Sequence, residues 1–341
     1  MKSQMKIRGV NWVDGMKVRS DHFVQLERYV DERTRDAIAS AHSRLTYGLL
    51  SEPTGLTIRE MAGDQRRTFL SLSSCNAITP AGLRVQIPWG DGDGRVLQND
   101  SAELIAGKDN YVVVMAHDDR IPVGDVADEI PRRQKDSLPR YTVDLFTSEM
   151  VLSDDRCVAV AKIPKSDRVS DATYVPPCAV MGAHRLLRDY ACDIITLCRE
   201  MMENAAAVAH REGETSSRNE QMIEFAKAVA FCVGGSIDSL DMTYAELPPY
   251  KLYEFVLRLA RSARLMFTLL PEKRATREFY DTLKKRGFRR EQYDPLEKRV
   301  LDSIHEYVQH DVMLHFDPMR RYVTELAHVF KGGRDRTTII E

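Results

Sequence analysis

The hydrophobic pattern of the chain changes near Tyr174–Val180, and this change constrains the fold more than any other feature. Before it, from about residue 49 to residue 164, short runs rich in β-branched residues are separated by Gly, Pro and Asp. After it, apolar residues recur at steps of three and four, which is typical of amphipathic helices. Strands followed by helices predict an α+β fold and disfavour a doubly wound parallel sheet, in which the two alternate.

The first half of the chain reads as a series of short strands. We expect them in LTIREM, RTFLSLSSCNAIT, LRVQIPW, NYVVVMAH, YTVDLFT and CVAVAKIP. The breakers between them are TPAG, WGDGDG, AGKDN and DEIPRRQKDSLP. Several short strands with frequent turns predict a β-sandwich or a small barrel.

A helix is expected ahead of these strands. Ser20 or Asp21 supplies the N-cap. The intervening residues are charged, so this helix is amphipathic and is expected to bury one stripe. The stripe consists of Phe23, Leu26, Val30, Ala37, Ala41 and Leu45.

Four helical patterns follow Pro176, and their stripes are expected to be packed core. Three of them run from Leu187 to Val208, from Met222 to Leu240 and from Leu252 to Leu270, the last after the double proline at residues 248–249. The fourth runs from about Pro295 to Phe330, with a break or kink at Pro318. Short links between four such helices predict an antiparallel bundle. The expected domains are a β-sandwich over residues 1–175, a bundle over 176–331 and a tail over 332–341.

Charge and composition exclude several broad classes. The 49 basic and 51 acidic residues give a net charge of −2, so no global field draws the chain to nucleic acid or an anionic membrane. No signal peptide and no run of about eighteen apolar residues is present, so membrane insertion is not expected. None of the six cysteines forms a C-x-x-C pair, which favours free thiols in the cytoplasm.

Motifs for metal or nucleotide chemistry are weak. HEYVQH, from His305 to His310, resembles a zinc motif, but its histidines are five residues apart and point about 140° apart around a helix. His315 lies five residues after His310, so these two histidines also point to different sides of a helix. The segment WGDGDGR reads as a tight turn rather than a calcium loop. Phosphate-binding loops and the G-x-S-x-G elbow are absent. We therefore expect no metal, no cofactor and no catalysis.

The basic segment KKRGFRR, Lys284–Arg290, is the sharpest local charge patch. Its position predicts a loop between the third and fourth helices, near several acidic residues. Binding of nucleic acid through this segment is one alternative. A solvated loop, or a docking surface for an acidic protein, is the favoured interpretation.

The segment NWVDGMKVRSDHFVQLERY carries the most specific pattern in the chain. It resembles the N-terminal signature of TssK, the family of type VI secretion system baseplate subunits. The matching residues are Trp12, Asp14, Gly15, Met16, His22, Phe23, Gln25, Glu27, Arg28 and Tyr29. YGLL, ITPAGLRVQIP, YVPPCAVMGAH and LPPYKLYEFVLRLA also resemble that family in order, so the resemblance spans about residues 11–270.

The resemblance implies an architecture and a role. TssK proteins have a shoulder like that of phage receptor-binding proteins, then a helical bundle, and they form trimers. It therefore implies a non-enzymatic, homotrimeric adaptor that binds the wedge subunits TssF and TssG and links the baseplate toward the membrane complex. Two departures stand out: Pro248 replaces the usual His, and the chain ends at Glu341, where the family continues into a head domain. The resemblance thus fits a shortened or trimmed form, and contact with membrane-complex components through a head is not carried over.

The signature residues also have a direct physical interpretation. Gly15 permits a tight turn, Trp12 and Phe23 can anchor a strand and a helix by burial, and Arg28 offers a planar fork to a carboxylate or carbonyl. The same side chains could instead contact a partner. The sequence does not decide between these two roles, nor which surface faces the wedge.

An enzyme with a site between the two domains remains the alternative function. It would require His117, Asp118 or Asp119 to meet other polar groups in a deep pocket.

Overall fold

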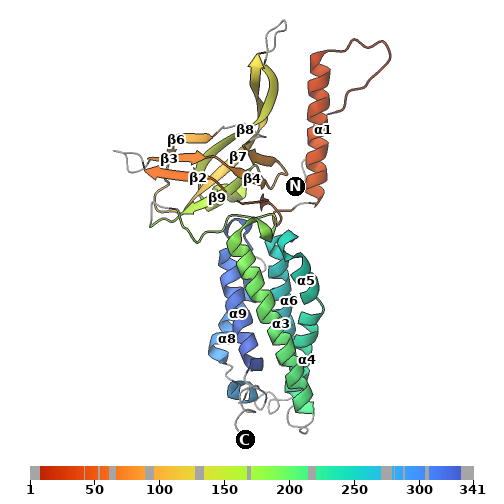
Figure 1. The fold of residues 1–341 in the computed structure, drawn as a ribbon, viewed down its shortest axis with the longest axis vertical. Coiled ribbons are helices and arrows are strands. Elements are labelled where there is room, and N and C mark those ends of the chain that lie inside the picture. The colour runs from red at the N-terminus through yellow and green to blue at the C-terminus, as the bar shows by residue number, and fades with distance from the viewer. Residues whose placement is uncertain are drawn as a thin grey trace. The chain divides into compact units, whose positions relative to one another are not determined.

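The computed structural model describes residues 8–41, 43–52, 54–60, 67–88, 96–126, 134–166, 170–213, 220–269, 279, 281–286, 289–303 and 307–331. The chain divides into two compact units, Met1–Pro177 and Cys178–Glu341. The first unit contains the sheets and the second is helical (Figure 1). The expected α+β class, with strands first and helices afterwards, is confirmed.

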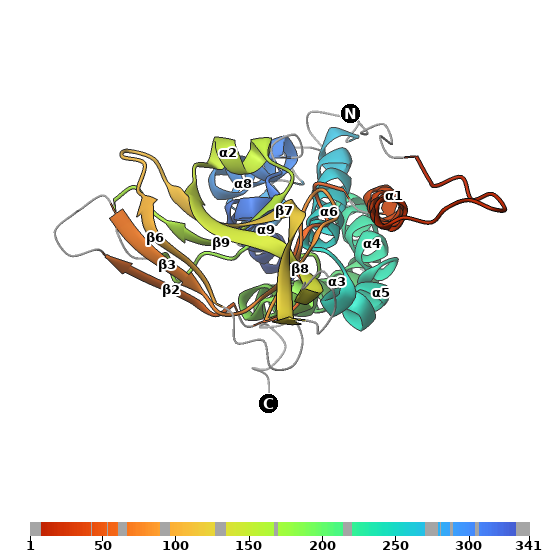
Figure 2. The same cartoon turned by 90° about the horizontal axis from the view of Figure 1, so that it is seen from above.

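Three small sheets build the first unit. One has the order β1-β4-β5, from Gly48–Leu49, Cys75–Ile78 and Arg84–Ile87. The second has the order β2-β3-β6, from Leu56–Glu60, Arg67–Leu72 and Leu97–Glu103, whose strands lie side by side in Figure 2. The third has the order β8-β7-β9, from Gln134–Phe146, Asn110–Val126 and Cys157–Ile163. All of these described pairs are antiparallel, as expected.

The third sheet holds much of the buried core of this unit. Val112, Val113 and Val114 on β7 have no exposed surface. The Tyr111 ring meets the Tyr174 ring edge-on, with 5.8 Å between their centroids. A run of valines suits this central strand because both of its faces are covered. Thr147 caps the short helix α2, Ser148–Ser153, which also packs on this sheet.

Two strand predictions were wrong at particular places. β6 was missed because LQNDSAE is polar and mostly exposed, as an edge strand tolerates. Part of the predicted breaker DEIPRRQKDSLP belongs to β8, which begins at Gln134. Pro139 is tolerated there because β8 is an edge of its sheet, where a missing N–H leaves no partner unsatisfied.

The second unit consists of the predicted helices. They are α3 Arg185–Gly213, α4 Glu220–Gly234, α5 Ile237–Thr243, α6 Pro249–Thr268, α8 Arg290–Asp302 and α9 Met313–Lys331. Short 3-10 turns lie at Met181–Ala183, Tyr244–Glu246 and Gln309–Asp311. Helix α6 begins at the double proline, as predicted. The second predicted helix is interrupted after Gly234, where two successive glycines weaken the helix.

The interpretation of the apolar stripes as packed core is confirmed in this unit. Leu187, Ile194 and Met201 of α3 are fully buried, and the Phe225 and Phe330 rings stack at 5.6 Å. The hydroxyls of Tyr293 and Tyr322 hydrogen-bond each other at 2.9 Å inside the same core. Among the described helices, none combines the length and apolarity that crossing a bilayer requires.

Of the predicted break or kink at Pro318, the break was wrong. Helix α9 runs through Pro318, and the interruption lies earlier, between Asp302 and Met313. Pro318 is the sixth residue of α9, so it removes the hydrogen bond to the Leu314 carbonyl and crowds that carbonyl near the helix start, and burial of Pro318 in the core accompanies this cost. None of the six cysteines forms a disulfide bond.

Candidate partner-binding surface

Helix α1, Ser20–Ala41, was predicted from its apolar spacing and is confirmed. It begins at Ser20, so Arg19 occupies the cap position, where the sequence had predicted Ser20 or Asp21. The backbone N–H of Arg19 donates to Nδ1 of His22 at 3.3 Å, so His22 satisfies a backbone group at the helix start. This contact resembles a capping box, in which a side chain of the first turn reaches back to the preceding residue.

Polar contacts join helix α1 to the distal half of β7. Glu27 pairs with Arg120, and Arg35 pairs with Asp118 at 2.9 Å. Asp118 lies where the β7–β8 register shifts, and such irregularities redirect side chains. Exposed ion pairs of this kind contribute about 0–1 kcal/mol each, so they fix the place of α1 more than they stabilise it.

A close apolar contact accompanies these ion pairs. Gly82 has a φ of 77°, and a Cβ placed there would lie 2.8 Å from Cγ2 of Ile38 on α1. The glycine thus permits both a left-handed turn and the approach of the helix. The side of α1 that meets its own unit is therefore marked by Glu27, Arg35 and Ile38.

The segment before α1, residues 8–19, folds back along the helix and is called the N-terminal arm here. The Gln25 side chain donates to the Arg8 carbonyl at 2.8 Å, and Gly9 packs against the Tyr29 ring. A turn closes where the Met16 N–H donates to the Val13 carbonyl, with Gly15 at a φ of 78°. No atom lies within 4 Å of a Cβ placed at Gly15, so its backbone angle, rather than lack of space, favours glycine.

Trp12, His22 and Phe23 form an exposed aromatic cluster. The Trp12 ring lies 6.1 Å from the His22 ring and 6.2 Å from the Phe23 ring, measured between centroids. Trp12 is 46% exposed and Phe23 is 57% exposed. The structure therefore does not bury these two aromatics in the sheets, as the anchoring interpretation required; they pack on one another at the surface.

The apolar stripe of α1 is also exposed, which corrects the expectation that the helix buries it. Val30 is 52% exposed, Ala37 is exposed and Leu26 is only half-buried. The stripe and the side marked by Glu27, Arg35 and Ile38 occupy different faces of the helix. Periodicity predicted the stripe, but it could not show how far these side chains are exposed.

Arg28 lies on another face of α1. Phe23 and Arg28 are five residues apart, so they point about 140° apart around the helix. An open groove of about 470 Å³ is lined by Ser20, Asp21, Val24, Gln25 and Arg28. Within the described part of the chain, no ion pair engages the Arg28 guanidinium, which is therefore available to a carboxylate or carbonyl.

The remaining signature residues support the arm or the helix. Asp14 is exposed in the turn with Gly15, and Met16 is half-buried. Tyr29 accepts a hydrogen bond from Arg33 at 3.2 Å, and the same guanidinium lies over the Tyr29 ring. The structure thus gathers Trp12, His22 and Phe23 in one cluster and places Arg28 apart from them. The partners of α1 on β7 were not predicted, because Glu27 and Arg120 are 93 residues apart in sequence.

The polar residues proposed for an enzyme do not converge on one point. His117 shares a hydrogen bond of 2.8 Å with Thr142, while Asp118 is engaged by Arg35. Asp119 accepts a hydrogen bond from Arg140 at 2.9 Å, which lowers its pKa. Each of these side chains is therefore engaged by a different residue, and the three do not point to one shared position where a reaction could occur.

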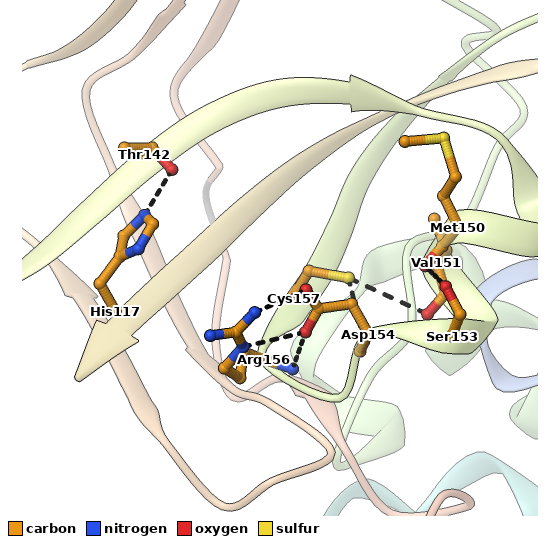
Figure 3. A network of polar contacts seen from close by, with 8 residues as sticks. All are labelled: His117, Thr142, Met150, Val151, Ser153, Asp154, Arg156 and Cys157. Carbon is orange, nitrogen blue, oxygen red and sulfur yellow. Dashed lines mark hydrogen bonds and ion pairs between the residues drawn. The ribbon is translucent and has the colours of Figure 1, made fainter.

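Cys157 lies near these groups without forming a catalytic pair. Its sulfur is 3.3 Å from the Asp154 carbonyl and 3.9 Å from the Val151 carbonyl, while His117 turns to Thr142 (Figure 3). Burial, followed by the charge of Asp154, raises the pKa of this thiol to about 12. A thiol that stays protonated is a poor nucleophile.

The histidines of the zinc-like segment have structural surroundings where they are described. His315 accepts a hydrogen bond from the Val308 N–H at 3.1 Å, and its ring stacks on Tyr307 at 5.0 Å between centroids. In the described ranges, no three potential metal ligands come together. His305 and the WGDGDGR turn lie outside the described residues.

The prediction that the basic segment Lys284–Arg290 lies in a loop was wrong in part. Lys284 and Lys285 lie within helical residues 281–285, not in a loop. Residues 287–288, which include its aromatic residue, lie outside the described part of the chain.

Comparison with known proteins gives the fold. No family model and no curated protein matches the chain. A chain of the type VI secretion baseplate complex matches with a TM-score of 0.56 at 14% identity, over 96% of this chain and 100% of that one. A chain of the TssK–TssF–TssG baseplate subcomplex matches with a TM-score of 0.52 at 16% identity, over 95% and 99%.

A crystal structure of TssK itself is matched less completely. The TM-score is 0.47 at 15% identity, and the match covers 74% of this chain but only 60% of that TssK. At such low identities the two baseplate matches establish a shared fold. The chain thus shares the α+β fold of the matched baseplate chains.

Proposed function

We propose that this chain, which has the fold of type VI secretion baseplate chains, is a TssK-like structural adaptor without catalytic activity. Two independent findings support the proposal: the N-terminal signature in the sequence and the structural match over nearly the whole chain. The observation that carries it is the exposed aromatic cluster on the N-terminal arm and α1, formed by residues of that signature. We place the adaptor in the cytoplasm, where thiols that form no disulfide are stable.

The proposal includes the finer architecture of the two units. The three antiparallel sheets would form a β-sandwich shoulder over residues 1–175. Helices α3, α4, α6 and α9 would form a four-helix bundle over residues 176–331, because α3 contacts α4 and α9, and α6 also contacts both. Such a closed ring of neighbours is what a bundle requires.

The proposed partners are two further copies of the chain and wedge subunits of the TssF and TssG type. One matched chain comes from a complex of TssK with TssF and TssG. Trp12 presents a large, rigid apolar surface, and the Arg28 guanidinium faces an open groove. Tryptophan and arginine dominate the binding energy of many protein interfaces, so we assign the wedge contact to these two side chains.

Co-purification tests this function. The chain is co-expressed with a tagged TssF–TssG pair from the same secretion system, and the amount retained is compared among variants. Trp12→Ala and Arg28→Glu should each lower retention at least tenfold, since truncating an anchor residue costs about 2 kcal/mol or more. Arg321→Glu, on the exposed side of α9, is the matched control and should bind like the unmodified chain.

The outcomes are decisive when folding is checked by circular dichroism. If both variants are retained as well as the unmodified chain, the assignment of the wedge contact to Trp12 and Arg28 is wrong. If the TssF–TssG pair does not retain even the unmodified chain, the adaptor function itself is wrong.

A further inference from the structure

We propose that His315 is a protonation switch: its neutral ring holds residues 307–311, called the pre-α9 segment here, and a proton taken up from solvent releases them. The pre-α9 segment also holds the backbone at Cys178, the first residue of the helical unit. The switch lies within the helical unit and goes beyond the proposed adaptor function.

The His315 ring accepts a hydrogen bond from the backbone of the pre-α9 segment. The Val308 N–H donates to Nε2 of His315 at 3.1 Å. A neutral imidazole has one N–H and one bare nitrogen, so an accepting Nε2 places the proton on Nδ1. A charged imidazole carries a proton on both nitrogens and can only donate. Protonation therefore turns the ring and the Val308 N–H into two donors that face each other.

The surroundings of the ring confine it. His315 is only 7% exposed. Its ring stacks on Tyr307 with 5.0 Å between the centroids, and it meets the Tyr253 ring edge-on at 5.9 Å. The Tyr253 hydroxyl in turn shares a hydrogen bond of 2.8 Å with the Ser303 hydroxyl. Because two tyrosine rings confine the imidazole, we expect the conflict at Val308 to displace the pre-α9 segment rather than the ring.

A second chain of hydrogen bonds connects the pre-α9 segment to the start of the helical unit. The Tyr307 hydroxyl donates to Oε1 of Gln309 at 2.8 Å, and Nε2 of Gln309 donates to the Cys178 carbonyl at 2.8 Å. Gln309 is only 3% exposed, so breaking either bond would leave a buried polar group unsatisfied. Displacement of the segment at Val308 therefore also weakens the hold on Cys178.

Burial and two nearby charges set the proton affinity of His315. Burial, the largest cause, lowers the pKa of His315, because desolvation opposes the charged ring. Asp311 of the segment raises this pKa, and Arg299 of α8 lowers it. The other titratable side chains of α6 and of the segment at this place are Tyr253, Tyr307 and His310.

The direction of the pH dependence follows from the lowered pKa. When the segment opens, His315 returns to the ordinary histidine pKa of about 6.5, so the open form takes up a proton before the closed form does. The closed form is therefore fully stable above about pH 6.5 and loses stability as the pH falls below that value. Between pH 7.5 and pH 5.5, one histidine can raise the equilibrium constant for opening by about tenfold at most.

Hydrogen exchange followed by mass spectrometry measures this opening. Each exchange rate is divided by the intrinsic rate at the same pH, so that only structural opening is compared. In the unmodified chain, exchange of residues 307–316 should rise by about three- to tenfold from pH 7.5 to pH 5.5. The Met181 N–H, which donates to the Leu247 carbonyl shortly after Cys178, should respond in the same direction. Helix α4 has no histidine and serves as the internal reference.

Two histidine variants of α9 separate the switch from general effects of acid. His315→Gln offers an amide oxygen as acceptor in place of Nε2 but does not titrate, so its exchange should be equal at the two pH values within about twofold. His328→Gln is the matched control, because His328 is exposed on the same helix. It should keep the full pH dependence of the unmodified chain.

The measurement decides even if His315→Gln does not fold. Fragmentation of the peptide resolves the Val308 N–H itself, and its exchange in the unmodified chain should show the rise. Equal exchange of this N–H at both pH values overturns the inference without any variant. A pH dependence that persists in a folded His315→Gln chain would belong to another group, such as His310, and would overturn it as well.

Discussion

The approach of α1 to the first unit can be tested at a single glycine. Gly82 and Gly107 both have a left-handed φ, of 77° and 76°, so alanine at either position costs about 1–2 kcal/mol in backbone conformation. They differ in surroundings: a Cβ at Gly82 would lie 2.8 Å from Ile38 on α1, whereas nothing lies within 4 Å at Gly107. Gly82→Ala therefore carries an additional overpacking cost of about 1–3 kcal/mol.

This additional cost should appear at α1, because the helix can relieve the contact by moving away. Hydrogen exchange followed by mass spectrometry measures the opening of α1 separately from that of the sheets. We expect α1 peptides to exchange at least fivefold faster in Gly82→Ala, which corresponds to about 1 kcal/mol, but not in Gly107→Ala. Ile38→Ala removes Cγ2 and should abolish the difference when combined with Gly82→Ala.

Equal exchange of α1 in the two glycine variants would refute this reasoning. It would mean that Ile38 does not press α1 against the Gly82 turn. A double variant as fast as Gly82→Ala alone would lead to the same conclusion.

Four further predictions concern pH, packing and thiols. The pKa of Glu297 is raised mainly by burial, so the charged form opposes folding; Glu297→Gln should melt higher than the unmodified chain at pH 7, and the advantage should vanish below about pH 4. The Lys165 N–H lowers the pKa of Asp109, so Asp109→Asn should melt lower at pH 7, with a difference that shrinks as the pH falls below about 4 through the folded pKa. Tyr322→Phe removes one hydrogen bond of the buried Tyr293 hydroxyl and should lower the free energy of unfolding of the helical unit by about 0.5–1.5 kcal/mol in urea titrations. Cys192 should react with a maleimide in the native chain while buried Cys75 and Cys198, whose pKa values burial raises to about 12, stay unmodified until the chain unfolds.

Much of the fold could be predicted because local patterns determine it. The stripes of α3 and α6 specify buried faces, and the prolines at residues 248–249 mark where α6 begins. The polar strand β6 could not be found in this way, since its place depends on pairing with β3 and on contacts such as that of Asn99 with the Val143 carbonyl. Pro318 misled the prediction because tertiary packing overrides a local break signal: Phe316, Pro318 and Met319 are all buried in α9.

The candidate site was only partly predictable for a related reason. Trp12, His22 and Phe23 are close in sequence, so their clustering follows from one turn and one helix start. Which face of α1 meets β7 depends on Arg120 and Asp118, whose distance along the chain hides the contact. The spacing of the stripe therefore predicted an apolar face but not that it would remain exposed.

Native mass spectrometry of the chain co-expressed with TssF and TssG from the same secretion system tests the central claim most directly. The account predicts an assembly in which this chain is present in three copies, or a multiple of three, bound to the wedge subunits. A single, unbound copy of the chain in the presence of a folded TssF–TssG pair would contradict it.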